Sequence, residues 1–383
     1  MTPAARCQAA IEVLDRVTTG IAAEQALTNW ARGARFAGSK DRAAVRDHVY
    51  TVIRCQRSCA AHGGGEAGRA LILGLLRAEG ADPADVFTGE GYGPEPLTDA
   101  ELSAGRTPDS AEAMDMPDWL LPRLKASLPE VEPTALALRE RAPVFLRVNR
   151  LRGTVDVAQE SLLAEGIATQ PHALSPSALE VTEGARRVHL SRAYAEGLVE
   201  LQDAASQAVV DQLPLRAGMR VLDYCAGGGG KALAMAARLS GPVEAHDADP
   251  RRMSDLPKRA ERAGAQIARI DRPGGLYDLI LCDAPCSGSG AWRRSPEGKW
   301  ALTEARLQEL QDIQLGILRE ASAYLTTDGH LAYVTCSILS DENDTVIDRF
   351  LADRPDWRVA DRRQFLPVEG GDGFFLALMS ADA

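Results

Sequence analysis

Hydrophobic residues recur at intervals of three and four along the first 80 residues, the spacing of amphipathic helices. A first helix is predicted to begin at Thr2, a favourable capping residue, and to end at Gly20. Further helices are predicted around 23–30, from Ser39 onward, and over 71–76 after a run of three glycines. This part of the chain is therefore predicted to be an all-α bundle.

A mixed pattern follows between residues 119 and 210. A helix is predicted from Asp118 to Leu128 and another over 155–164. Short apolar runs at 143–148, 179–181 and 188–190 have the length and composition of strands. This segment is predicted to be a small α+β subdomain.

From Met219 the pattern becomes a regular alternation of strands and helices, which is typical of a parallel sheet. The predicted strands cover 220–224, 243–246, 266–270, 277–282, 330–334 and 373–378. The predicted helices cover 231–239, 251–263, 302–325 and 343–351. The expected fold of this region is an open α/β domain, in which ligands bind outside the carboxyl ends of the strands.

The stretch YDLILCDAPCSGSG, residues 277–290, is the centre of this pattern. Its apolar run predicts a strand buried on both faces, and Pro285 must end the strand because it has no backbone N–H. Asp283 and Cys286 are thereby placed at the carboxyl end of the strand. A carboxylate and a thiol are predicted at the ligand-binding edge.

Other strand ends carry similar groups. Asp223 and Asp247 end the first two strands, and Cys336 follows the fifth within Thr335-Cys336-Ser337. A thiolate in such a polar loop can act as a nucleophile if its pKa is lowered. The cysteines at 7, 55, 59 and 282 are instead interpreted as buried apolar residues, and no metal site is expected because no second ligand pair lies near 55 and 59.

The glycine-rich loop from Cys225 to Lys231 allows several interpretations. A P-loop is excluded because Cys225 replaces its first glycine and Ala232 its Ser or Thr. A dinucleotide fold and a nucleoside cofactor without pyrophosphate both require a glycine loop and an acid about 20 residues later, and Asp247 meets that requirement. A simple strand-to-helix turn is the third possibility, so the loop alone does not identify a cofactor.

The composition of the 383-residue chain, with 45% hydrophobic and 25% charged residues, is typical of a globular protein. No apolar run has the length of a membrane span, and the seven cysteines show no disulfide spacing, so a cytoplasmic protein is expected. The net charge of −11 is uneven: residues 82–118 hold ten acids and one arginine, whereas residues 1–62 hold nine bases and five acids. The acidic segment is predicted to be a mobile linker. The arginines of the third helix fit either a solvated surface or an RNA contact.

Together, the motifs DAPCSGSG and TCS and the loop ending in Gly-Gly-Lys closely resemble the RsmB/Sun family of RNA cytosine-5 methyltransferases. PVFLRVN, LQDAASQAVV, RRSP with a following KW, and EGGDGFF extend the resemblance over most of the chain. It implies a multidomain protein: an N-terminal all-α NusB-like helical bundle (1–80), the acidic linker (81–118), an α+β RNA-binding subdomain (119–210) and a C-terminal α/β Rossmann-like class I methyltransferase domain (211–383).

The resemblance also implies roles for individual residues. Cys336 would be the nucleophile, Cys286 would help release the product, and Asp283 would contact the target base near the methyl donor. Asp247 would bind the cofactor ribose and Asp271 its adenine side. S-adenosyl-L-methionine would be held by the loop residues Cys225, Ala226, Gly227, Gly228, Gly229, Gly230 and Lys231.

This sequence departs from the family pattern at two positions. Gly228 stands where the family usually has proline, which predicts a looser loop and weaker cofactor binding. Arg272 follows Asp271 where glycine is usual, so the chain departs from the family pattern next to the expected adenine contact.

The expected substrate is RNA, and by analogy 16S ribosomal RNA. Four arginines, Arg147, Arg150, Arg293 and Arg294, are expected to contact its backbone. A monomer without membrane association is expected. Two alternatives remain: an RNA-binding assembly factor without catalysis, and a nicotinamide-dependent oxidoreductase, in which the thiol pair would have no role.

Overall fold

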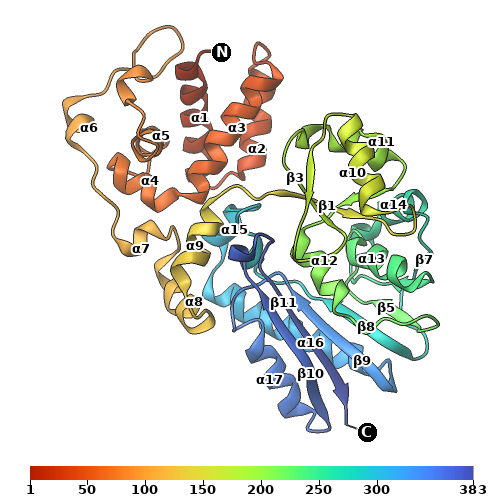
Figure 1. The fold of residues 1–383 in the computed structure, drawn as a ribbon. Helices are drawn as coiled ribbons and strands as arrows, with labels where there is room; N and C mark the ends of the chain where they lie inside the picture. Colours follow the sequence, from red (N-terminus) through yellow and green to blue (C-terminus); the bar gives the residue numbers. More distant parts are fainter. Residues whose placement is uncertain (383) are drawn as a thin grey trace. The chain divides into compact units, whose positions relative to one another are not determined.

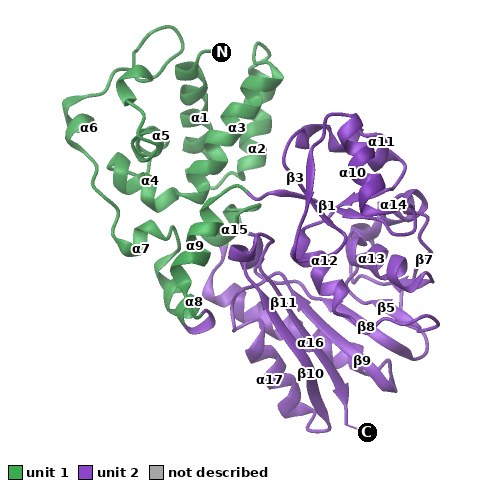
Figure 2. Cartoon of the chain, viewed as in Figure 1, with its two compact units in different colours: residues 1–125, 129–141, 292–301 green, residues 126–128, 142–291, 302–383 purple. Residues whose placement is uncertain are grey.

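The computed structural model describes residues 1–382 (Figure 1). The chain divides into two compact units (Figure 2). The first comprises residues 1–125, 129–141 and 292–301, and the second comprises residues 126–128, 142–291 and 302–383. Within residues 1–382, no helix is both long and apolar enough to cross a membrane.

The first unit is built from helices, as predicted. Thr2 caps the first helix through a 3.2 Å hydrogen bond from the Ala5 amide to its hydroxyl. The core of the unit is formed by apolar faces of α1, α2, α3 and α5. Its helices are α1 (Pro3–Thr18), α2 (Ala23–Gly33), α3 (Ser39–Arg54), α4 (Gln56–Gly63), α5 (Gly68–Ala78), α6 (Asp99–Ser103), α7 (Ser110–Ala113), the start of α8 (Leu121–Ser127), α9 (Val131–Arg139) and α15 (Glu297–Ala301).

The acidic segment 82–118 is part of this unit, so the prediction of a mobile linker is wrong. Phe87 is buried in the helical core, and Asp115 is fully buried. The Asp115 carboxylate accepts hydrogen bonds from the Ser58 amide (2.9 Å) and hydroxyl (2.8 Å) and pairs with Arg139 at 2.9 Å. Composition suggested disorder, but capped turns and paired carboxylates compensate for the small amount of apolar surface.

The second unit begins with a four-stranded antiparallel sheet in the order β2-β3-β1-β4. Its strands are β1 (Val144–Val148), β2 (Thr169–Pro171), β3 (Ala178–Val181) and β4 (Val199–Leu201). Two helices accompany it, α10 (Val155–Ala164) and α11 (Arg192–Ala195). The strand predicted at 188–190 is instead the end of a 3₁₀ helix, Ala185–Leu190, in which Val188 alone is buried.

A seven-stranded sheet in the order β10-β11-β9-β8-β5-β6-β7 forms the rest of this unit. Strands β5 to β9 pair in parallel, and β10 and β11 are antiparallel additions at one edge. The strands are β5 (Val221–Asp223), β6 (Val243–Ala245), β7 (Ile267–Arg269), β8 (Tyr277–Asp283), β9 (Leu325–Thr335), β10 (Trp357–Phe365) and β11 (Phe374–Ala381). The helices are α12 (Ala204–Asp211), α13 (Gly230–Leu239), α14 (Leu256–Ala263), α16 (Glu304–Ser322) and α17 (Asp344–Asp353).

Both faces of this sheet are covered, as the apolar run of β8 predicted. Leu279 and Leu281 pack with α12 and α13, whereas Ile280 and Cys282 pack with α16 and α17. The alternation follows from the two-residue period of a strand. The mixed α/β sheet confirms the Rossmann-like part of the predicted fold.

Candidate active site

The sheet order places a topological switch point between β5 and β8. The chain runs from β5 outward to β6 and β7, and then returns to the other side of β5 as β8 and β9. Asp223 and Asp283 end the two strands that flank this point, and Cys336 directly follows β9. The predicted strand-end residues therefore share the edge at which open α/β sheets bind ligands.

The glycine loop owes its shape to two positions. Gly227 and Gly229 have φ of +50° and +78°, the left-handed region that favours glycine. A Cβ on Gly229 would also lie 2.2 Å from Cδ1 of Leu256. Gly228 has no positive φ, and a Cβ there would meet only Nη1 of Arg259, at 2.9 Å. The backbone conformation at Gly228 therefore permits a side chain, and no backbone atom would block it.

Lys231 begins the buried part of α13 and reaches Asp283. Its Nζ donates to Oδ2 of Asp283 at 2.7 Å and lies 4.9 Å from the ring centroid of Phe374. Burial alone would lower the pKa of Lys231, but the Asp283 carboxylate, with Cys336 and Asp223 nearby, raises it. A permanent positive charge is thus held at the edge of the sheet.

Asp223 is buried beside this pair. Neither carboxylate oxygen of Asp223 has a hydrogen-bond partner among the described residues. The nearby Ala232 amide lowers the pKa of Asp223, but burial has the larger and opposite effect. Burial, with the Asp283 charge, raises the pKa of Asp223 to about 7. An orphaned buried carboxylate calls for a partner that the protein itself does not supply.

The two predicted thiols come together from different loops. Sγ of Cys286, after β8, lies 3.3 Å from Sγ of Cys336, after β9. The hydrogen bond with Cys336, desolvation and the Glu342 carboxylate raise the pKa of the Cys286 thiol well above its ordinary value. The raised pKa favours the protonated form of Cys286, and its S–H can donate to the Cys336 sulfur.

Glu342 connects these two loops, and sequence reasoning missed it. Its fully buried carboxylate accepts from the Ser287 amide at 2.8 Å, from the Ser337 hydroxyl at 2.6 Å and from Gln314 at 3.1 Å. Ser287 follows Cys286 and Ser337 follows Cys336, so a single side chain holds both thiol-bearing loops. The only signal in the sequence was an acid six residues after Cys336, which a solvent-exposed helix start would also explain.

Asp247 and Asp271 lie at the carboxyl ends of the next strands. Asp247 is buried and accepts hydrogen bonds from the amides of Gly227 (2.9 Å) and Asp249 (3.0 Å). Arg252 pairs with it at 3.2 Å. Asp271 is exposed two residues after β7. Their roles toward a ribose and an adenine remain predictions.

The four arginines expected at RNA divide into two kinds. Arg150 and Arg294 are exposed. Arg147 is buried and donates to the Gly230 carbonyl at 2.7 Å and to the Gln202 amide oxygen. Arg293 is also buried. The expectation for Arg147 and Arg293 is corrected: Arg147 supports the glycine loop, and neither side chain is exposed for an RNA phosphate.

The segment 292–301 belongs to the helical unit although it follows the Cys286 loop in sequence. Lys299 Nζ donates to the carbonyl of Arg54 at 2.7 Å, and the Trp300 indole donates to the carbonyl of Ile53 at 2.8 Å. Glu297 accepts from the Ala23 amide at 2.7 Å. The segment therefore satisfies groups at the end of α3 and the start of α2 that helices cannot satisfy themselves.

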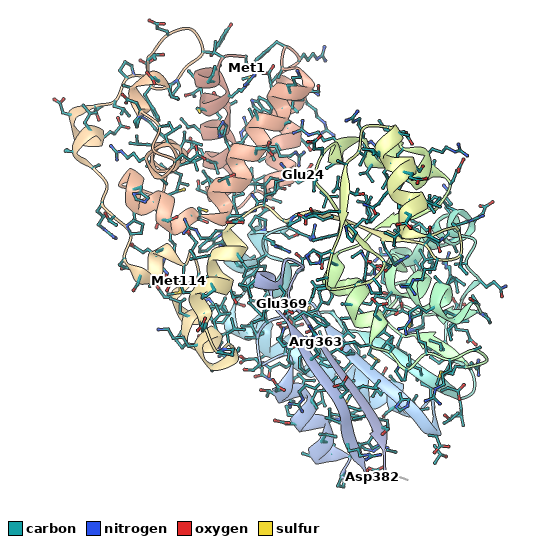
Figure 3. The ribbon with its side chains drawn as sticks, viewed as in Figure 1. Met1, Glu24, Met114, Arg363, Glu369 and Asp382 are labelled. Atoms are coloured by element: carbon teal, nitrogen blue, oxygen red, sulfur yellow. The ribbon has the colours of Figure 1, made fainter. Side chains whose placement is uncertain are left out.

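The EGGDGFF stretch is held by its first residue. Glu369 accepts from the Leu366 amide at 2.8 Å and pairs with Arg363 at 3.3 Å (Figure 3). Further along, the Gly373 amide donates to the carbonyl of Gly290 at 2.9 Å. A Cβ on Gly290 would lie 2.1 Å from the Gly373 carbonyl oxygen, so this close approach requires glycine.

The residues at this edge fit S-adenosyl-L-methionine. Its amino group could pair with the orphaned Asp223 carboxylate, and its ribose hydroxyls need an acid such as Asp247. Because glycine has no Cβ, the backbone of the glycine loop can approach the cofactor closely. No group of three or more His, Cys, Asp or Glu with the arrangement of a metal site occurs in the described chain.

Similar solved structures show the class of fold. The crystal structure of PH0851 superposes with a TM-score of 0.78 at 23% identity, covering 99% of each chain. A methyltransferase homolog protein from Pyrococcus horikoshii superposes with a TM-score of 0.62 at 22% identity, covering 70% of this chain and 96% of that one. The mixed sheet with its strand-end residues therefore has the same Rossmann-like fold as these two structures.

Sequence comparisons identify the family. Residues 210–379 match the family described as 16S rRNA methyltransferase RsmB/F, and residues 116–188 match the ferredoxin-like domain of RsmF/B-like methyltransferases. Ribosomal RNA small subunit methyltransferase B of Vibrio cholerae is 36% identical over 297 residues, 73% of this chain and 68% of that protein. The Citrobacter koseri protein of the same name is 36% identical over 281 residues, 68% of this chain and 65% of that protein.

The chain belongs to the RsmB/F methyltransferase family, which confirms the predicted resemblance. It matches about two thirds of the length of these curated relatives. The match at 116–188 also falls largely within the predicted α+β subdomain.

Proposed function

We propose that the protein is an S-adenosyl-L-methionine-dependent RNA cytosine-5 methyltransferase that acts on small-subunit ribosomal RNA through a covalent bond between Cys336 and the base. The observation that carries this proposal is the pair of thiols, 3.3 Å apart, at the ends of two neighbouring parallel strands. A non-catalytic assembly factor would have no use for that pair, and hydride transfer by a nicotinamide-dependent oxidoreductase does not require it.

The first step belongs to Cys336. Carbon 5 of cytosine is a poor nucleophile, so the Cys336 thiolate adds to carbon 6 and a sulfur–carbon bond forms. Because the pKa of Cys286 is raised, its thiol stays protonated, and its S–H donates a hydrogen bond that stabilises the Cys336 thiolate before the attack. The target base must leave its stack to reach the two thiols, so an unpaired or extruded cytosine is expected.

Lys231 and Asp283 act on the ring that gains electron density. Asp283 would accept a hydrogen bond from the exocyclic amino group of cytosine. The Lys231 ammonium, 2.7 Å from Asp283, places positive charge at the same edge. Because this charge is fixed before the reaction, it favours the electron-rich adduct over the free base.

The second step releases the product. The bound cofactor supplies an electrophilic methyl group to carbon 5. The carbon-5 proton then passes to water, the Cys336–carbon bond breaks, and the departing sulfur receives the Cys286 hydrogen bond. Glu342 holds both loops in register during these steps through Ser287 and Ser337.

Trapping of the covalent adduct tests this proposal. Purified Cys286→Ala protein, incubated with cofactor and 16S ribosomal RNA, is expected to give a slow-migrating protein–RNA band on a denaturing gel. Cys336→Ala and the double variant are expected to give none, because the bond to carbon 6 cannot form. A band from Cys336→Ala alone would reverse the two roles, and the absence of a band from every variant would contradict covalent catalysis.

The helical unit is proposed to be a NusB-like module that helps to hold RNA, with exposed Arg150 and Arg294 as further phosphate contacts. Charge reversal of Arg150 and Arg294 should weaken RNA binding and reduce its salt dependence without changing cofactor affinity. Equal RNA affinity in the double variant would exclude these two contacts. The same RNA preparation, analysed by bisulfite sequencing, would identify the methylated cytosine.

A further inference from the structure

The helical unit contains a hollow that is lined by none of the residues of the proposed active site. It is formed by the start of α1, the end of α2 with the residues that follow it, and the loop 90–95, and its volume is about 930 Å³. All of these segments belong to the first unit, and Met1, which is labelled in Figure 3, is one of the lining residues. The proposed methylation chemistry does not use this hollow.

Three aromatic side chains line the hollow. Trp30 is largely buried, whereas Phe36 and Tyr92 are 73% and 83% exposed. The rings of Phe36 and Tyr92 are stacked, with centroids 6.4 Å apart and planes inclined by 19°. Large aromatic rings exposed together are characteristic of surfaces that bind a partner.

The charge of the lining is negative. Glu12, Glu90 and Glu95 line the hollow, and no lysine or arginine side chain does so among the described residues. Met1 also lines the hollow, and its amino group is paired with Asp41 at 3.2 Å. Two of the three carboxylates belong to the acidic segment 82–118, in which Val86 and Phe87 are buried in the core of the helical unit.

We propose that this hollow binds a basic peptide segment of a partner protein, with an arginine side chain placed against the Phe36 and Tyr92 rings. A guanidinium is planar, stacks on aromatic faces and is attracted both by their electron density and by the three carboxylates. RNA is disfavoured at the same place, because its phosphates would face carboxylates and no lysine or arginine lines the hollow among the described residues. The proposal is independent of the catalytic assignment and goes beyond it.

Fluorescence anisotropy with a labelled peptide tests the proposal. The probe is an eight-residue peptide of alternating glycine and arginine, compared with a glycine–glutamate peptide and an eight-nucleotide oligouridine. The protein is expected to bind the arginine peptide and neither of the other two. The double variant F36A/Y92A is expected to weaken peptide binding at least tenfold, and E90Q/E95Q to weaken it and reduce its salt dependence.

Two controls separate this site from general attraction between a polycation and an acidic chain. Leu102→Ala removes another exposed apolar side chain of the same unit outside the hollow and should leave binding unchanged. Melting curves should show that the aromatic variants remain folded, since both rings are mostly exposed. Unchanged peptide affinity in folded F36A/Y92A would overturn the proposal, as would oligouridine binding that these substitutions abolish.

Discussion

Two lysines are buried among the described residues, and they differ in whether a carboxylate contacts the ammonium group. Lys231 lies at the edge of the seven-stranded sheet with its Nζ 2.7 Å from the Asp283 carboxylate. Lys299, in the helical unit, donates instead to the neutral carbonyl of Arg54 at the same distance. Burial lowers the pKa of Lys299 to about 8, although Asp115 opposes the shift, whereas the pKa of Lys231 is raised despite burial.

The comparison shows that burial of an ionisable group does not by itself mark a functional site. Both side chains lose their hydration, but only Lys231 has a formal counter-charge in contact. Its positive charge is therefore stable, as its proposed role at the substrate requires. Lys299 mainly supplies a hydrogen bond to a helix end, together with a 4.7 Å contact between its Nζ and the Trp300 ring.

The largest expected effect is on catalysis at Lys231. Lys231→Met should lower the single-turnover methylation rate about 10²- to 10³-fold, the usual loss when one electrostatic group of an active site is removed. Lys258→Met, at an exposed lysine of α14, is the matched control and should be unaffected. If Lys231→Met kept more than a tenth of the wild-type rate, the proposal that the charge of Lys231 contributes to catalysis would be contradicted.

The next largest effect is on stability at Asp115, the carboxylate that favours the charge of Lys299. Asp115→Asn should lower the free energy of unfolding by about 2 kcal/mol, because the neutral amide replaces a buried carboxylate that accepts from Ser58 and pairs with Arg139. The melting temperature should fall by about 4–8 °C, at roughly 2–4 °C per kcal/mol. Asp118→Asn breaks an exposed pair with Arg57 and should cost less than about 1 kcal/mol. Equal melting temperatures of the two variants would restore the linker interpretation.

The contrast also shows what the sequence could and could not reveal. The strand ends at Asp223, Asp283 and Cys336 were predictable, because parallel strands bring their carboxyl ends to one edge whatever the rest of the chain does. Glu342 and Lys299 were not predictable. Their partners lie 55 and 245 positions away, at Ser287 and Arg54. Only the folded chain determines such contacts.

Errors in the fold have equally specific causes. Strand β10, Trp357–Phe365, was missed because it is an edge strand with four charged residues among nine, is largely exposed, and lacks an apolar alternation. The strand predicted at 188–190 was wrong because its apolar residues do not share a face: Leu190 is 75% exposed. The acidic segment was misassigned because composition does not record that Arg69 and Arg139 supply counter-charges.

Alkaline titration sharpens the lysine comparison. The unfolded state binds a proton at residue 299 up to the ordinary pKa of 10.5, but the folded state loses it near 8, so stability increases with pH in between. Denaturant unfolding should show that wild type gains about 1 kcal/mol over Lys299→Met between pH 8 and pH 9. Lys231 has the opposite sign, since its raised folded pKa gives stability that is lost at alkaline pH. A flat difference between wild type and Lys299→Met would mean that Lys299 keeps its proton in the folded state.

The smallest expected effect lies in the loop that leads into Lys231. Gly228→Ala should stabilise the protein by about 0.5 kcal/mol, because alanine reduces the freedom of the unfolded chain at a position without positive φ. The new Cβ would meet only the end of the flexible Arg259 side chain, which must shift slightly from its hydrogen bond with the Gly228 carbonyl. Gly229→Ala is the matched control and should destabilise, since Leu256 lies 2.2 Å from the added Cβ and φ is +78°. A stiffer loop should also bind S-adenosyl-L-homocysteine slightly more tightly in calorimetric titration. If Gly228→Ala weakened that binding, the freedom of Gly228 would be needed for the cofactor, and the glycine found here in place of the family's usual proline would be an adaptation.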